Sequence, residues 1–183
     1  MSDPAAIVWQ GKYITVRKQG TWEYVGRARN IHAAVILAID DGCVLLVEQF
    51  RVPLNARCLE LPAGLVGDES QGEAIETAAA RELEEETGYR PGRIETVGRF
   101  ASSPGMVSET FTLVRAHELT KVGEGGGVDN EGITVHRVPL DDVPAYVEAR
   151  RNEGFIIDVK LLVLLGASLL SSPLPLREGP GVG

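Results

Sequence analysis

The sequence predicts an α/β fold in which helices cover both faces of a mixed β-sheet, preceded by a small N-terminal antiparallel sheet. Two adjacent apolar runs, separated by Asp-Asp-Gly, are typical of strands covered on both faces. A helix pattern follows them, and further strand and helix patterns come after it. The chain of 183 residues is long enough for one such domain with a substantial core.

We expect residues 1–30 to form the N-terminal sheet, residues 31–170 the main domain and residues 171–183 a disordered tail. The N-terminal strands are predicted at 12–18 and 21–29, because both segments are rich in β-branched and aromatic residues and flank a Gln-Gly turn. The tail is rich in Pro and Gly.

The main domain opens with the two apolar runs, 32–39 and 43–50, which we expect to form a hairpin, and a short strand at 59–61. A Gly-rich loop follows, and then a helix from about Glu73 to Thr87 that Gly88 ends. Strands are expected at 94–100, 110–117 and 133–140, with loops at 102–109 and 121–132.

Two helices are expected near the C-terminus. Asp141 is predicted to cap a helix that runs through Arg151, and Asp158 to cap a last helix that ends near Leu170. The last helix is too short and too interrupted to cross a bilayer.

Composition excludes some classes of partner. A formal net charge of −8 disfavours binding to nucleic acid and to anionic membranes. Cys43 and Cys58 are far apart in the sequence and are expected to be buried thiols in a reducing compartment. The first residues do not have the pattern of a signal peptide, and we expect a cytoplasmic protein.

The helix ends in an unusual concentration of acidic residues: Glu82, Glu84, Glu85 and Glu86. Because a helix turns about 100° per residue, the first, third and fourth share one face and Glu84 points to the far side. Like charges at this spacing destabilise a helix by a few tenths of a kcal/mol each. Either solvation of the carboxylates or a bound cation must compensate.

Ala78 and Ala79 fall on the same face and are expected to leave room for a ligand. The donors on this face are all hard oxygens, which match Mg²⁺, with Mn²⁺ as a substitute. The scattered His32, His117 and His136 are read as ordinary strand residues.

The segment 67–89 resembles the Nudix box, the signature of the Nudix hydrolase superfamily. The matching positions are Gly67, Glu73, Arg81, Glu82, Leu83, Glu85, Glu86, Gly88 and Tyr89. There is one departure, because the family glycine usually lies in an Ala-Gly-Leu segment. Here that glycine is Gly64, nine residues rather than six before Glu73, as if three residues were inserted.

The resemblance implies a Nudix-type α/β/α sandwich that hydrolyses a nucleoside diphosphate linked to another group. It implies Glu82 and Glu86 as principal metal ligands, Glu85 as ligand or orienter, and the Ala63 carbonyl as a further ligand. Arg81 would brace the glutamates, although a surface ion pair is the simpler alternative. Glu73 is expected to be structural.

In related enzymes the general base often comes from a loop. The acidic loop before residue 133 resembles that of ADP-ribose pyrophosphatases, so Glu131 is the first candidate and Asp129 the second. A helix glutamate, or a loop without any catalytic role, remains an alternative.

Residues 10–170 resemble the ADP-ribose pyrophosphatase branch, which implies cleavage of ADP-ribose to AMP and ribose 5-phosphate. Arg51 would clamp a phosphate bidentately. Tyr13 and Trp22 would stack the base, often across a homodimer interface. Pro104 and Met106 would shape the pocket, with Glu109 beside them.

Two alternatives stay open. One is a GDP-mannose or other nucleotide-sugar pyrophosphatase on the same scaffold. The other is a catalytically silent module that binds a nucleotide sugar, although the presence of all three face glutamates weighs against it.

Overall fold

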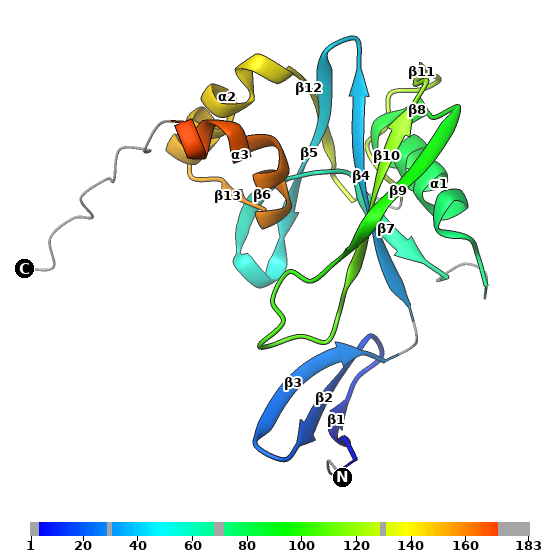
Figure 1. The fold of residues 1–183 in the computed structure, drawn as a ribbon, viewed down its shortest axis with the longest axis vertical. Coiled ribbons are helices and arrows are strands. Elements are labelled where there is room, and N and C mark those ends of the chain that lie inside the picture. The colour runs from blue at the N-terminus through cyan, green and yellow to red at the C-terminus, as the bar shows by residue number, and fades with distance from the viewer. Residues whose placement is uncertain (1–3, 29–30, 68–71, 129–130, 172–183) are drawn as a thin grey trace, which may run out of the picture.

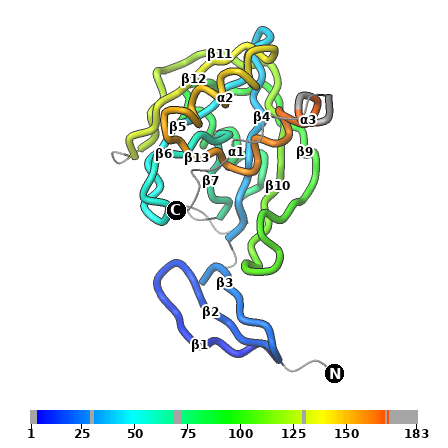
Figure 2. The backbone as a smooth tube through the Cα atoms, turned by 90° about the vertical axis from the view of Figure 1, so that its left-hand side faces the viewer, coloured from blue at the N-terminus to red at the C-terminus, as the bar shows by residue number. Residues whose placement is uncertain are grey.

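The structure, a computed structural model, describes residues 4–28, 31–67, 72–128 and 131–171. Helix α1 covers one face of a mixed β-sheet, and α2 and α3 cover the other (Figure 1). A three-stranded antiparallel sheet stands apart at the N-terminal end (Figure 2). The predicted α/β/α sandwich with a small N-terminal sheet is therefore confirmed. The tail expected from residue 171 falls, after its first residue, outside the described residues.

The elements have the following bounds. The N-terminal sheet contains β1 (Ala6–Gln10), β2 (Ile14–Gln19) and β3 (Trp22–Arg27). The main sheet contains β4 (His32–Asp40), β5 (Cys43–Arg51), β6 (Ala56–Glu60), β7 (Ala63–Val66), β9 (Arg93–Phe100), β10 (Phe111–His117), β12 (Thr134–Pro139) and β13 (Ile156–Ile157). The short strands β8 (Tyr89–Arg90) and β11 (Thr120–Lys121) pair with each other. The helices are α1 (Ile75–Thr87), α2 (Val143–Asn152) and α3 (Leu162–Ser171).

The predicted hairpin of β4 and β5 is confirmed at its turn, but the two strands soon part. They pair only through Ile39 with Val44 and Asp40 with Cys43. Beyond this point β4 pairs with β7 and in parallel with β10, whereas β5 pairs with β6 and β12. The separation of these two central strands opens the space in which the candidate site lies.

Both central strands are buried on both faces, as their apolar runs predicted. Alternate residues enter two different cores because successive side chains of a strand point to opposite faces. One core, shared with α2 and α3, includes Val35, Val44, Leu46, Leu59, Val147 and Leu161. The other, shared with α1, includes Ala34, Ile36, Leu45, Ala78, Ala79, Leu83 and Val114.

Helix α1 ends where the sequence predicted and begins two residues later than expected. Gly88 follows Thr87 with φ of 75°, a left-handed conformation that glycine adopts without steric cost, and its N–H donates to the Glu84 carbonyl. At the other end, the helix begins at Ile75, after Ala74.

The prediction that Asp141 caps the helix after β12 is wrong. Leu140–Asp142 form a 3-10 turn, α2 begins at Val143, and the residue at its N-cap is Asp142, whose side chain makes no capping hydrogen bond. Pro144 lies in the first turn and has no N–H for a cap to bind. The other predicted cap is present, because Asp158 Oδ1 accepts the Lys160 N–H at 2.7 Å in the 3-10 turn that leads into α3.

Several elements were not predicted. Strand β7 occupies part of the expected Gly-rich loop, because residues 63–66 pair with β4 although glycine is a poor strand former. Strand β1, which pairs with β2, was not predicted because its sequence lacks a clear strand pattern. The N-terminal sheet is joined to the main domain by hydrogen bonds of Val25 with Met106 and Ser108.

Candidate active site

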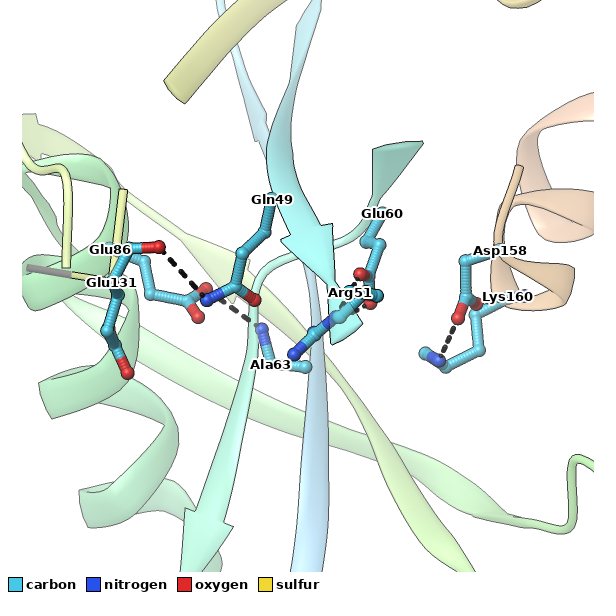
Figure 3. A network of polar contacts seen from close by, with 8 residues as sticks. All are labelled: Gln49, Arg51, Glu60, Ala63, Glu86, Glu131, Asp158 and Lys160. Atoms are coloured by element: carbon cyan, nitrogen blue, oxygen red, sulfur yellow. Dashed lines mark hydrogen bonds and ion pairs between the residues drawn. The ribbon is translucent and has the colours of Figure 1, made fainter. Parts of the chain in front are cut away.

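A cavity of about 430 Å³ lies where β4 and β5 have separated. Its walls come from these strands, from β6, β7 and α1, and from the loops before β10 and β12. Figure 3 shows Glu86 and Glu131 on one side of this region and Asp158 and Lys160 on the other. The cavity therefore joins segments that are far apart in the sequence.

The acidic side of the cavity contains Glu82, Glu86 and Glu131. Glu86 is 8% exposed, and one of its carboxylate oxygens accepts the Ala63 N–H at 3.1 Å. Burial raises the pKa of Glu86 from 4.5 to about 8, the Ala63 N–H opposes this rise, and the negative charges of Glu82 and Glu131 add to it. A nearby cation would stabilise the ionised form of this carboxylate.

Gly64 explains the close packing of helix α1 against β7. A Cβ atom at this position would overlap the carboxylate carbon of Glu82, so only glycine leaves room for that side chain. Gly67, which satisfies the motif spacing, has φ of 86° and donates its N–H to Glu73 at 3.4 Å. Gly64 thus allows the close contact with α1, and Gly67 satisfies the spacing of the motif. Residues 68–71, between Gly67 and Glu73, lie outside the described residues.

Arg81 lies among the acidic side chains of this helix and its N-terminal flank. Its Nη1 is 3.1 Å from Glu82 and 3.2 Å from Glu85, and its Nε is 3.6 Å from Glu73. Its Nη2 donates to the Leu65 carbonyl at 3.5 Å. This arrangement matches the bracing expected for Arg81 and a structural position for Glu73. Glu85 is directed to Arg81 and is not among the cavity-lining residues described.

The first candidate base reaches the same cavity as the helix carboxylates. Glu131 accepts the Val128 N–H at 3.2 Å through its carboxylate, and its backbone carbonyl accepts from Gln49 Nε2 at 3.5 Å. Gln49, on β5, was not singled out in the sequence. The second candidate, Asp129, lies outside the described residues.

The donor set fits a hard divalent cation. Glu82, Glu86 and Ala63 line one cavity and offer only oxygen ligands, and burial together with the neighbouring acids raises the pKa of Glu86. Among the described residues, no three His, Cys, Asp or Glu side chains already form a metal cage. Oxygen donors are the ligands that Mg²⁺ prefers in proteins.

Three cationic side chains also line the cavity, and each is paired with an acid. Arg51 Nε and Nη2 contact Glu60 at 2.5 and 2.9 Å, so this edge of its guanidinium group is occupied by the carboxylate. Two of these pairs were not predicted from the sequence: Arg27 with Glu109 at 2.6 Å, and Lys160 with Asp158 at 2.6 Å.

The other residues singled out in the sequence have mixed outcomes. Ala78 and Ala79 leave no room for a ligand, because both are fully buried in the core beneath α1. That prediction is wrong, since the carboxylate face continues into the core one turn before Glu82. Glu109 lines the cavity as expected. Cys43 and Cys58 are buried free thiols, also as expected.

Comparison with known families settles what kind of domain this is. A family model described as the NUDIX domain matches residues 28–158. The chain belongs to the Nudix family. The acidic helix α1 is thus a Nudix helix, and its Glu82 and Glu86 line the cavity where the helix meets the sheet.

Curated Nudix relatives carry two different substrate names. An ADP-ribose pyrophosphatase of Bacillus subtilis is 38% identical over 118 residues, which cover 64% of this chain and 62% of that protein. The chain therefore spans less than two thirds of the length of that relative. A GDP-mannose pyrophosphatase of Pectobacterium atrosepticum is 32% identical over 173 residues, 87% of this chain and 86% of that protein.

A solved structure supports the fold. It is described as the crystal structure of an ADP compounds hydrolase, and it superimposes with a TM-score of 0.67 at 23% identity. The match covers 93% of this chain and 94% of that one. Among the described residues, no helix has the length and apolar character needed to cross a membrane.

The aromatic and loop residues expected to bind substrate lie away from this Nudix cavity within one subunit. The described lining residues do not include Tyr13, Trp22, Pro104 or Met106. Trp22 and Tyr13 are 62% and 65% exposed on and beside the strands of the N-terminal sheet. Their roles in substrate binding stay predictions.

Proposed function

We propose that this Nudix protein hydrolyses the diphosphate bond of ADP-ribose, with Mg²⁺, to AMP and ribose 5-phosphate. The observation that carries the proposal is the convergence of Glu82, Glu86 and Glu131 on one cavity, which Arg27, Arg51 and Lys160 also line. A diphosphate brings negative charge to carboxylates, and a divalent cation is what makes that encounter favourable.

The residues divide into holding and reacting groups. Glu82, Glu86 and the Ala63 carbonyl would hold Mg²⁺, with Glu85 as an additional ligand or orienter and Mn²⁺ as a substitute ion. When bound, the ion would screen the diphosphate and lower the pKa of water. Glu131 would take the proton of the attacking water, which forms the new P–O bond as the bridging P–O bond breaks. Arg81 would keep the glutamates in place.

The substrate assignment rests on two supports. The B. subtilis relative is named for ADP-ribose, and residues 48–65 of this chain resemble that branch. GDP-mannose is the second candidate, because the P. atrosepticum relative is named for it. A silent binding module is a weaker alternative, since the helix carboxylates are present.

The first experiment incubates the purified chain with ADP-ribose or GDP-mannose, with and without Mg²⁺, and separates the products by chromatography. AMP formed only with Mg²⁺, and faster than GMP from GDP-mannose, is the expected result. Glu86→Gln and Glu131→Gln should each reduce the rate by about 10²-fold or more. Faster release of GMP would reverse the substrate assignment. Binding without cleavage of either compound would favour the silent module.

We also propose a cytoplasmic homodimer whose N-terminal sheets complete the sites. Strand β1 exposes Ile7, Val8 and Trp9 by more than half of their surface, which favours a partner across this sheet. Stacking on Trp22 or Tyr13 contributes roughly 1–3 kcal/mol per base. Trp22→Ala should therefore raise KM at least fivefold without changing the melting temperature. A fully active monomer in sedimentation would exclude this arrangement.

A further inference from the structure

The loop between β11 and β12 is unusually rich in glycine where it passes the C-terminal end of α1. We propose that Gly125–Gly127, the glycine segment, is a positioning element that fixes the candidate base Glu131 relative to the metal-binding helix. This inference rests on the proposed function and extends it to residues that contact neither substrate nor metal.

Backbone hydrogen bonds attach the segment to the helix. Gly126 donates its N–H to the Glu86 carbonyl at 2.9 Å, and Gly127 donates to the Glu85 carbonyl at 3.0 Å. The last carbonyls of a helix have no partners within the helix itself. Here the loop supplies those partners, and the carbonyls belong to two of the residues whose side chains form the acidic face.

The contact requires glycine for steric reasons. Gly125 has φ of 71°, and a Cβ atom there would lie 2.5 Å from the Glu86 carbonyl oxygen and 2.7 Å from the Thr87 Cα. These are backbone atoms, which cannot move aside without displacing the helix end. Gly126 and Gly127 also have positive φ, of 110° and 79°. Side chains in this segment would therefore lift the loop from the helix.

The segment is connected to Glu131 by a short series of contacts. The Gly126 carbonyl accepts the Ile133 N–H at 3.3 Å, which closes the loop behind the base. Gly127 lies against the Glu131 carboxylate. A Cβ atom at position 127 would overlap Glu131 Oε2. On the sheet side, Gln49 holds the Glu131 carbonyl. The base is thus fixed between α1 and β5.

This geometry ties the two halves of the site together. The backbone of Glu86 anchors the glycine segment, while the Glu86 side chain faces the cavity with Glu131. A displacement of about 1 Å of a reacting group can cost about 10²-fold in rate. Docking of the segment should therefore affect the chemical step through Glu131 and leave the ligands on α1 in place.

The test compares two glycines of the same loop. Gly125→Ala should lower kcat about 10²-fold, with KM for ADP-ribose and the Mg²⁺ concentration for half-maximal rate changed less than about threefold. Gly123→Ala is the matched control, because its φ is outside the left-handed region and its added Cβ would meet only the Gly88 Cα, at 3.9 Å. It should keep the wild-type kcat.

A double-mutant cycle separates positioning from a general structural role. If Gly125 acts through Glu131, Gly125→Ala should have almost no further effect on kcat in the Glu131→Gln background. Multiplied effects in the double variant, or an equal loss of Mg²⁺ affinity, would overturn the proposal.

Amide hydrogen exchange tests the docking without any activity measurement. In the wild-type chain, the Gly126 and Gly127 amides should be protected as strongly as the last turn of α1. Rapid exchange at both would overturn the proposal, even if Gly125→Ala fails to fold. If the wild-type chain does not hydrolyse ADP-ribose but these amides are protected, the proposed function fails while the docking stands.

Discussion

Glu86 is the residue at which burial and function oppose each other most clearly. Its carboxylate is nearly covered by protein and lies near two other acids, so it favours its protonated form in the absence of a cation. The unfolded chain has the ordinary pKa of 4.5, whereas the folded pKa is about 8. The folded state therefore binds an additional proton between these two values.

This difference predicts that the metal-free protein loses stability as pH rises. The contribution of Glu86 is fully present below about pH 4.5 and is lost as pH rises through 8. One pKa unit corresponds to about 1.4 kcal/mol, so the decline should be on the order of a few kcal/mol. Denaturant unfolding of the chelator-treated protein at pH 5 to 9 measures it. Glu86→Gln should flatten the curve, and an unchanged slope in this variant would contradict the assignment.

A second residue-level prediction concerns Gly64. A methyl group there would displace the Glu82 carboxylate, so Gly64→Ala should reduce Mg²⁺-dependent hydrolysis by about 10²-fold. Gly166→Ala is the control, because an added Cβ in α3 would meet no atom within 4 Å. Steady-state kinetics and the melting temperature of both variants check this. Equal activity of the two variants would show that Glu82 tolerates the shift.

At the scale of elements, only one of the two aspartates predicted to cap helices makes a capping hydrogen bond. Asp158 accepts an amide hydrogen bond and pairs with Lys160, whereas Asp141 lies in a 3-10 turn before a proline-containing helix start. Asp158→Ala should destabilise the protein by about 1 kcal/mol or more. Asp141→Ala should stay within about 0.5 kcal/mol of wild type. Urea unfolding of both variants measures the difference, and equal losses would refute it.

The elements also show which signals a single sequence contains. Gly88 marked the end of α1 because a left-handed residue is a local requirement, and the apolar runs of β4 and β5 marked burial on both faces. Strand β7 escaped notice because its pairing with β4 overrides the low strand propensity of glycine. Helix rotation placed Glu82, Glu85 and Glu86 on one face, but only the structure shows that Arg81 holds Glu85 away from the cavity.

For the whole molecule, the proposed metal site leads to the expectation that metal binding stabilises the folded protein. If Mg²⁺ binds only the folded state, a concentration of 100 times Kd adds about 2.7 kcal/mol. The gain should be larger at pH 8 than at pH 6, because Glu86 must lose its proton to act as a ligand. Thermal melting with increasing Mg²⁺ at both pH values tests this. The Glu82→Gln, Glu86→Gln double variant should show no shift, and a full shift would place the ion elsewhere.

The sequence indicated the family and the acidic helix because both depend on local spacing. It indicated Arg51 but not the other two cavity cations, since Arg27 meets Glu109 and Lys160 enters the cavity only when distant segments assemble. The location of Tyr13 and Trp22 outside the cavity depends on the same long-range assembly. Features that depend on local sequence could thus be predicted, whereas contacts between distant elements could not.

The exposed β1 strand has a consequence for how the protein behaves on dilution. In the described chain it is the last strand of its sheet, with unpaired backbone groups beside Ile7, Val8 and Trp9. Such edges promote aggregation when nothing covers them. If the homodimer covers this edge, dilution below its dissociation constant would expose it. The protein would then adhere to surfaces and precipitate more readily in dilute solution than in concentrated stock.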